Sequence, residues 1–225
     1  MEGDSRARIC DTVGGGQAVI VANPAPMAYG VVATTARAIN ELKRRPAEQN
    51  VAVSVHDRSQ WRELEPAVDL PPGALRSVVQ LLRMRLTVLL PVGGTVPPPR
   101  WMAPALLDGR LAVFNGYWPA LDWLWQRFPR LYGSSANVTG EPAVTSAAAA
   151  MAMFGADCVL AEADTETDDS DPRWSSTMVS LDATGRISLH RSGAQDQVCG
   201  APAHDFIKEL ARTVGLRPAP KGTTP

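Results

Sequence analysis

Short aliphatic runs, each bounded by turn-forming residues, recur along this chain and constrain its fold more than any other feature. The first occupies residues 17–22, directly after three consecutive glycines, and Asn23 and Pro24 end it. A bounded run of this kind, rich in β-branched residues, is typical of a buried strand. Similar runs predict further strands at 51–55, 86–90, 111–114 and 131–134, and a late hairpin of 178–181 with 186–190.

Helical segments lie between these runs. Residues 35–45 place Ala38 and Leu42 on one face, and Pro46 ends the segment, because the residue before a proline disfavours helical backbone. Thr145 is expected to cap the helix that follows it, since its hydroxyl can accept a free first-turn N–H. Further helices are predicted at 75–83, 121–128 and 205–214. Helices and strands mix without a strict strand–helix–strand rhythm, so the pattern predicts an α/β protein with α+β character.

Composition restricts the classes of partner. The chain has 225 residues, of which 45% are hydrophobic and 20% charged, and its formal net charge is −1. A nearly neutral chain has no overall electrostatic reason to bind nucleic acid or an anionic membrane. No run approaches the roughly 18 apolar residues that a membrane span needs, and the first residues lack the apolar region of a secretory signal. We therefore expect neither nucleic acid nor a membrane as a partner.

The cysteines and histidines offer no metal site. The three cysteines lie far apart and form no CxxC pair, which predicts neither a disulfide framework nor zinc. His56, His190 and His204 have no His or Cys partner at ligand spacing. A reducing, cytoplasmic location is the simplest interpretation of the cysteine pattern.

Several sequence features allow more than one interpretation. The run of six carboxylates between residues 162 and 171 is either a solvated loop or a flap over a site. The tryptophans at 118, 123 and 125 favour core packing over a base-stacking platform. A basic surface for RNA would draw on Lys43, Arg44, Arg45, Arg83, Arg85 and Arg191, but the near-zero net charge argues against it.

Three polar segments could carry chemistry. Lys43, Arg44 and Arg45 end a helix, where cations complement the helix dipole, although three adjacent cations could also hold a polyphosphate. Residues 133–140 form a Gly-bounded turn of small hydroxyl and amide side chains before a helix, which suits an anion or is an ordinary loop. The third segment combines the serines at 175–176 and Thr177 with the stretch 191–193.

Together these segments resemble the YrdC-like family, to which threonylcarbamoyl-AMP synthases of the TsaC/YrdC type belong. The family pattern has a KxR-P at a helix end, an SxN turn, an S-T strand start and an R-x-G shortly after. Its counterparts occur here in the same order at 43–46, 135–140, 176–177 and 191–193, and the resemblance extends over residues 15–195. Four weak motifs in order are together fairly specific.

The resemblance implies a twisted, mostly open sheet with flanking helices and a deep cleft, in a domain over residues 15–215. Residues 1–14 would be an N-terminal extension and 216–225 a disordered Pro-rich tail. Family members act as nucleotidyltransferases: they take ATP with Mg²⁺, bicarbonate and threonine, and release pyrophosphate to form a threonylcarbamoyl adenylate. Related domains in carbamoyltransferases start from carbamoyl phosphate, so a partner transferase is also conceivable.

The resemblance also assigns roles by position. Lys43 and Arg45 would bind phosphate oxygens and supply the catalytic cations, with no protein metal ligand. Asn137 and Thr145 would hold the nucleotide, and Arg191 would contact it as well. The substrate-binding residues would be Ser135 and Ser176.

Departures from the family pattern lie on the acceptor side. Ala25 stands where the family has a substrate-binding threonine, Phe114 where it has an arginine suited to a carboxylate, and Ser54 where many members have a histidine. Losing an arginine removes a bidentate carboxylate partner. We therefore expect ATP binding but little threonine binding, and an amine or amino-acid acceptor other than threonine. The alternative is a degenerate YrdC-like module that binds nucleotide or supports a partner enzyme.

Overall fold

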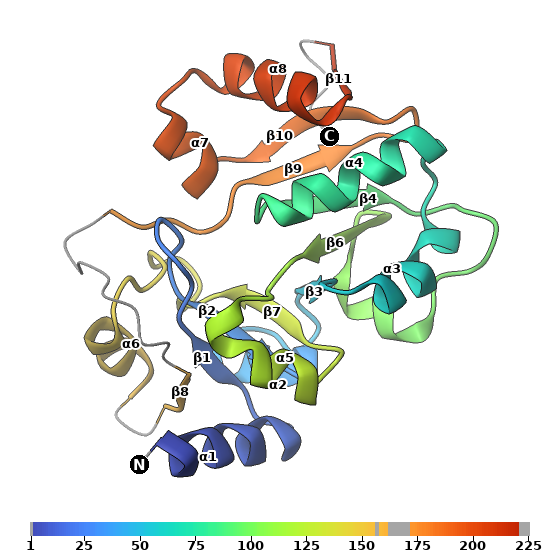
Figure 1. The fold of residues 1–225 in the computed structure, drawn as a ribbon. Coiled ribbons are helices and arrows are strands. Elements are labelled where there is room, and N and C mark those ends of the chain that lie inside the picture. Colours follow the sequence, from blue (N-terminus) through green and yellow to red (C-terminus); the bar gives the residue numbers. More distant parts are fainter. Residues whose placement is uncertain (1, 156–157, 162–171, 221–225) are drawn as a thin grey trace. The chain divides into compact units, whose positions relative to one another are not determined.

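The computed structural model describes residues 2–155, 158–161 and 172–220 (Figure 1). The chain divides into two compact units, each built from segments that are distant in the sequence. Unit 1 comprises Met1–Ser54 and Gly116–Ser175, and unit 2 comprises Val55–Asn115 and Ser176–Pro225.

Unit 1 is organised around a mixed sheet with the strand order β8-β1-β2-β7-β3. Its strands are β1 Val19–Val21, β2 Gly30–Ala33, β3 Ala52–Ser54, β7 Tyr132–Ser135 and β8 Leu160–Ala161. Strands β1, β2, β7 and β3 pair antiparallel in turn, whereas β8 runs parallel to β1. The predicted strands at 17–22, 51–55 and 131–134 are confirmed as β1, β3 and β7.

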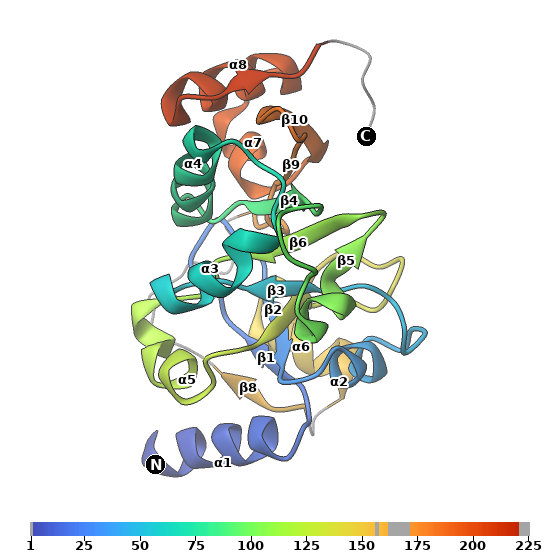
Figure 2. The same cartoon turned by 90° about the vertical axis from the view of Figure 1, so that its right-hand side faces the viewer.

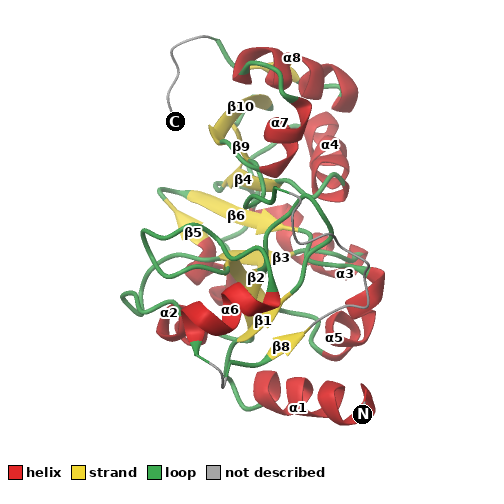
Figure 3. Cartoon of the chain, turned by 90° about the vertical axis from the view of Figure 1, so that its left-hand side faces the viewer, coloured by secondary structure: helices red, strands yellow, loops and turns green. Residues whose placement is uncertain are grey.

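The described residues of unit 1 form the helices α1 Glu2–Gly14, α2 Ala36–Leu42, α5 Asp122–Arg127 and α6 Ala147–Phe154. A short 3-10 turn, η3 Pro119–Leu121, precedes α5. Helix α1 fills the predicted extension and contacts β1 and β8 (Figure 3). Its side chains Ile9 and Val13 are buried. The tryptophans differ in burial, because only Trp125 is fully buried and the ring of Trp123 instead carries the Arg6 guanidinium 5.7 Å from its centroid.

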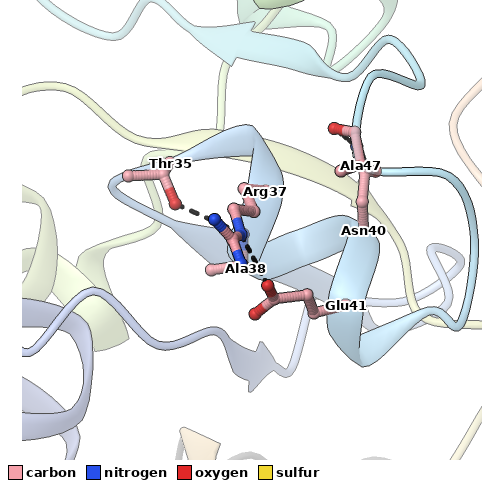
Figure 4. A network of polar contacts seen from close by, with 6 residues as sticks. All are labelled: Thr35, Arg37, Ala38, Asn40, Glu41 and Ala47. Atoms are coloured by element: carbon pink, nitrogen blue, oxygen red, sulfur yellow. Dashed lines mark hydrogen bonds and ion pairs between the residues drawn. The ribbon is translucent and has the colours of Figure 1, made fainter.

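The starts of α2 and α6 show how local sequence sets each helix. Thr35 caps α2, because its hydroxyl accepts the Ala38 N–H at 3.2 Å (Figure 4). The cap predicted for α6 at Thr145 is wrong by one residue. Ser146 is the cap: it has the extended backbone that an N-cap needs, and its hydroxyl accepts the Ala149 N–H at 3.2 Å.

The strands of unit 2 pair in the order β11-β10-β9-β4-β6, with β5 beside β6. Its strands are β4 Thr87–Pro91, β5 Leu106–Leu107, β6 Arg110–Phe114, β9 Met178–Leu181, β10 Arg186–Arg191 and β11 Arg217–Pro218. The predicted hairpin is confirmed as β9 and β10. An Asp182 carboxylate oxygen closes its turn by accepting the N–H groups of Thr184 and Arg186, each at 2.9 Å. Gly185 supplies the left-handed residue of the turn, with φ 78°.

The helices of unit 2 are α3 Arg58–Leu64, α4 Pro72–Arg83, α7 Ala194–Cys199 and α8 Ala203–Val214, with 3-10 turns η1 Glu65–Ala67 and η2 Arg100–Ala105. The amphipathic helices α4 and α8 pack beside the sheet (Figures 1 and 2). The Ser77 hydroxyl on α4 donates to the Val214 carbonyl at the end of α8, at 2.6 Å. The predicted helices at 75–83 and 205–214 are thereby confirmed.

Both units are thus mixed α/β, as the sequence predicted. The predicted tail begins within described structure, because β11 pairs with β10 and the Ala219 N–H donates to the Ile187 carbonyl at 2.8 Å. Residues 221–225 and the acidic segment 162–171 lie outside the described residues. Among the helices that are described, none is both long and apolar enough to cross a membrane.

Candidate functional site

Two of the predicted polar segments meet in unit 1 at the end of α2. Lys43 is the C-cap residue of α2 and is only 2% exposed, because α2 packs against β2 and β7. Its Nζ donates to Asn137 Oδ1 at 2.8 Å and to the main-chain oxygen of Ser135. A buried ammonium costs free energy unless oxygen acceptors surround it, and the polar turn supplies them.

The turn itself is fixed by hydrogen bonds to its own unit. Ser135 Oγ donates to Asn137 Oδ1 at 2.6 Å, the same atom that Lys43 contacts. Asn137 Nδ2 donates to the carbonyls of Val138 at 3.0 Å and Glu141 at 2.8 Å. Both ends of the Asn137 amide are therefore engaged within the protein, and its geometric effect is to position Lys43. Its predicted contact with a nucleotide stays a prediction.

Arg45 belongs to a separate network that organises the loop after α2. Asn40, fully buried, donates from Nδ2 to the Ala47 carbonyl at 2.7 Å (Figure 4) and to the Gln49 carbonyl at 2.8 Å. Its Oδ1 accepts from Arg45 Nε at 2.6 Å. Burial lowers the pKa of the half-buried Arg45, which nevertheless remains cationic at neutral pH. Arg44, between the two cations, is exposed and adopts a positive φ of 52°.

The loop after β1, which holds Ala25, rests on an arginine that the sequence motifs do not include. Arg173 is 8% exposed, and its NH1 donates to the carbonyls of Asn23 at 3.1 Å and Met27 at 3.4 Å. Arg173 therefore holds the two ends of this loop through hydrogen bonds to its backbone carbonyls. Thr145 is half-buried beside the α6 cap, and its predicted nucleotide contact stays a prediction.

Ser54, where many family members have a histidine, is 2% exposed and lies in unit 1. Its hydroxyl accepts the Gly116 N–H at 3.4 Å. The Ser54 side chain therefore forms a hydrogen bond with the backbone of its own unit.

The third predicted segment is assembled within unit 2. Arg191, at the end of β10, donates from NH2 to the Ser176 carbonyl at 3.1 Å. The Ser176 hydroxyl lies 2.7 Å from the Thr87 hydroxyl on β4. The two halves of this segment, fifteen residues apart in the chain, are thus in direct contact.

A buried carboxylate that sequence reasoning missed holds these halves together. Asp196, 7% exposed, accepts the Thr177 hydroxyl at 2.6 Å, the Gly193 N–H at 2.7 Å and the Ser192 hydroxyl. Burial acts to raise the pKa of Asp196, but these hydrogen bonds outweigh it and lower the pKa. An available signal was its place three residues after Gly193 at a helix start, which is the capping-box position.

The family comparison identifies the kind of chain to which these networks belong. The model of the Sua5/YciO/YrdC family, described as "Telomere recombination", matches residues 16–193. This chain is a member of that family. The resemblance drawn from the sequence motifs is thereby confirmed.

Solved structures of similar proteins share this fold. Sua5 of P. abyssi, in complex with L-threonine, is 23% identical, with a TM-score of 0.64 over 98% of this chain and 60% of that one. YciO of E. coli is 14% identical, with a TM-score of 0.59 over 84% of this chain and 90% of that one. A full-length HypF in its phosphate- and nucleotide-bound form is 16% identical, with a TM-score of 0.59 over 82% of this chain and 28% of that one.

At these identities the likeness shows the fold alone, and it confirms the predicted α/β class. This chain spans about three fifths of the Sua5 chain, as the 60% coverage states. Comparison with curated proteins gives no match.

Proposed function

We propose that this chain binds ATP and activates a carbamoyl or carboxyl group as an adenylate, releasing pyrophosphate, for an acceptor other than threonine. The observation that carries the proposal is the contact of Lys43 with the turn at 135–137 in a chain of this family. A carbamate oxygen would attack the α-phosphorus of ATP. The bond to the β-phosphate would then break, and its electron pair would leave with pyrophosphate.

In this reaction the protein supplies position and charge. Lys43 is held by two oxygen acceptors before any ligand arrives, so its ammonium needs no reorganisation to face a developing negative charge. Arg45, fixed by Asn40, would be the second cation on the polyphosphate. Positioning and charge stabilisation account for most catalysis in phosphoryl and nucleotidyl chemistry.

Mg²⁺ would enter with ATP, bound mainly by the phosphate oxygens, as is common for this ion. Among the described residues there is no group of three His, Cys, Asp or Glu side chains that could hold a metal ion. The residues present therefore fit an ion carried by the nucleotide, whose chemical role would be to neutralise phosphate charge.

The acceptor side supports a substrate other than threonine. Phe114 is half-buried on β6 and cannot pair with a carboxylate as the family's arginine would. Ala25 lacks the hydroxyl of the family threonine, and the Ser54 hydroxyl already binds the backbone. These changes leave the proposed nucleotide residues intact.

The test is pyrophosphate release from ATP with bicarbonate and a panel of amines and amino acids, or with carbamoyl phosphate. We expect Lys43→Met to lower turnover at least about a hundredfold, the loss typical when a preorganised charge donor is removed. Lys208→Met, which changes an exposed lysine on α8, is the matched control and should keep full turnover. Turnover that survives Lys43→Met would contradict the assigned role of Lys43.

A second candidate function is a nucleotide-binding or partner-supporting module without turnover. Two observations favour it: the engaged Asn137 amide, and the match to HypF, in which the similar region is 28% of a longer chain. Saturable ATP binding without pyrophosphate release from any of these substrates, together with co-purification of a transferase, would establish this second function.

A further inference from the structure

One backbone N–H of the polar turn in unit 1 donates to a thioether sulfur and not to an oxygen. The N–H groups of Ala136 and Asn137 donate to carbonyl oxygens at 2.9 and 3.1 Å. The next N–H along the chain, that of Val138, donates to Met153 Sδ at 3.2 Å. Because a thioether sulfur is a weak acceptor, Val138 has the weakest backbone hydrogen bond of the three.

Met153 belongs to a neighbouring element that has its own anchor. It lies in the last turn of α6, whose start is capped by Ser146. Its side chain is half-buried, and the residue is fifteen positions from Val138 in the sequence. The hydrogen bond from Val138 therefore joins α6 directly to the turn and fixes the orientation of the peptide group between Asn137 and Val138.

A continuous series of hydrogen bonds connects this sulfur to the buried lysine. The Val138 N–H donates to Met153 Sδ, and the Val138 carbonyl accepts from Asn137 Nδ2 at 3.0 Å. Oδ1 of the same Asn137 amide accepts from Lys43 Nζ at 2.8 Å. All of these groups belong to unit 1, so a displacement of Val138 changes the position of the amide that holds Lys43.

We propose that Met153 is a positioning residue for Lys43 and makes that position sensitive to oxidation. Hydrogen peroxide transfers one oxygen atom to a lone pair of Sδ; the O–O bond breaks, the thioether is oxidised to the sulfoxide and the peroxide is reduced to water. An added oxygen does not fit between Sδ and the Val138 nitrogen, because an N–H···O bond alone takes about 2.7–3.2 Å and the whole N–S distance is 3.2 Å. If the oxygen takes the other lone pair, the sulfur becomes positively polarised and no longer attracts the N–H.

This inference goes beyond the proposed function, because it concerns where Lys43 is held and not what Lys43 binds. Met153 belongs to none of the four family motifs. Dedicated reductases return methionine sulfoxide to the thioether, so the effect of oxidation on Lys43 is expected to be reversible.

The readout is the NMR spectrum of protein carrying ¹³C at the lysine Cε atoms. The chain has three lysines, so Lys43→Met assigns the Lys43 signal, and Lys208 and Lys221 serve as internal references. Met153→Leu keeps the apolar volume and removes the acceptor, and we expect it to shift the Lys43 signal alone. Met151→Leu, the same change at an exposed position of α6, is the matched control and should shift none of the three signals.

Met153→Gln tests the acceptor itself, because its side chain has a similar length and ends in an amide oxygen. We expect the Lys43 signal of this variant to lie closer to its wild-type position than that of Met153→Leu, which a purely packing role of Met153 would not produce. This variant also keeps the test available if Met153→Leu fails to fold, since its response to peroxide can be compared directly with that of the wild type.

Peroxide treatment followed by dithiothreitol isolates the effect of methionine oxidation, because the thiol reverses sulfenic acids and disulfides but not methionine sulfoxide. We expect oxidised wild type and oxidised Met151→Leu to show the Lys43 shift, methionine sulfoxide reductase to reverse it, and Met153→Gln to show no shift.

An unmoved Lys43 signal in Met153→Leu, or an equal shift in Met151→Leu, would overturn the positioning role of Met153. A peroxide response that persists in Met153→Gln would overturn the proposed sensitivity to oxidation. A failed turnover assay with an intact Lys43 response would contradict only the proposed function.

Discussion

Single residues in this protein matter mainly through the partners that hold them. Lys43, Asn137 and Ser135 were predicted from short motifs, but their mutual contacts were not, because a one-dimensional pattern does not show which oxygen accepts a given proton. Asn40, Arg173 and Asp196 were missed for the same reason. Each is an ordinary polar residue in the sequence and becomes important only when the folded chain surrounds it.

Asp196 provides a prediction at this scale. Asp196 accepts hydrogen bonds from three donors: the hydroxyls of Thr177 and Ser192 and the Gly193 N–H. In Asp196→Asn an amide N–H faces one of these donors in place of an acceptor oxygen, so we expect the free energy of unfolding to fall by about 1–3 kcal/mol at neutral pH. Since folding lowers the pKa of Asp196, its ionised form stabilises the protein fully above the unfolded value of 3.8, and this contribution is lost as the pH falls through the folded pKa.

Urea unfolding at pH 7 and near pH 3 measures both effects. The difference in the free energy of unfolding between wild type and Asp196→Asn should be large at pH 7 and small near pH 3. Glu48→Gln, an exposed loop substitution, should match wild type at pH 7. A gap that does not change with pH would show that the carboxylate charge is not the stabilising feature.

Elements with a clear period or a clear boundary were predictable from the sequence. The helices α2, α4 and α8 have apolar faces with proline or a capping hydroxyl at their ends, and β4 and β6 are bounded aliphatic runs. The strands β8 and β11 have only two residues each, which is too short for any period to appear. Helix α1 was missed because it is mostly polar and buries only Ile9 and Val13 of its apolar side chains.

The start of α6 separates a structural hydroxyl from a proposed binding hydroxyl. Ser146→Ala removes the cap and should cost about 1 kcal/mol of stability with ATP affinity unchanged. Thr145→Ala should leave stability nearly unchanged and weaken ATP binding, as its proposed nucleotide contact implies. Urea midpoints and ATP titrations of both variants measure this separation. The reverse assignment, with Thr145 controlling stability, would contradict the cap geometry.

At the scale of the whole molecule, the motifs are divided between two units. The segments at 43–46 and 135–140 belong to unit 1, whereas 176–177 and 191–193 belong to unit 2. Each unit is assembled from two stretches of chain, so the order of motifs along the sequence gave the family but not this division.

The last prediction concerns which ligands the whole chain binds: we expect it to bind ATP and not L-threonine. ATP should give saturable heat on calorimetric titration. Its affinity should fall with added salt, because salt screens the attraction between its phosphates and the protein's cationic side chains. L-Threonine, added to the ATP-loaded protein with bicarbonate, should give no saturable heat up to about 1 mM, since the carboxylate partner of the family is replaced by Phe114. Saturable threonine binding below that concentration would mean that other side chains bind its carboxylate, and the acceptor would then be threonine itself.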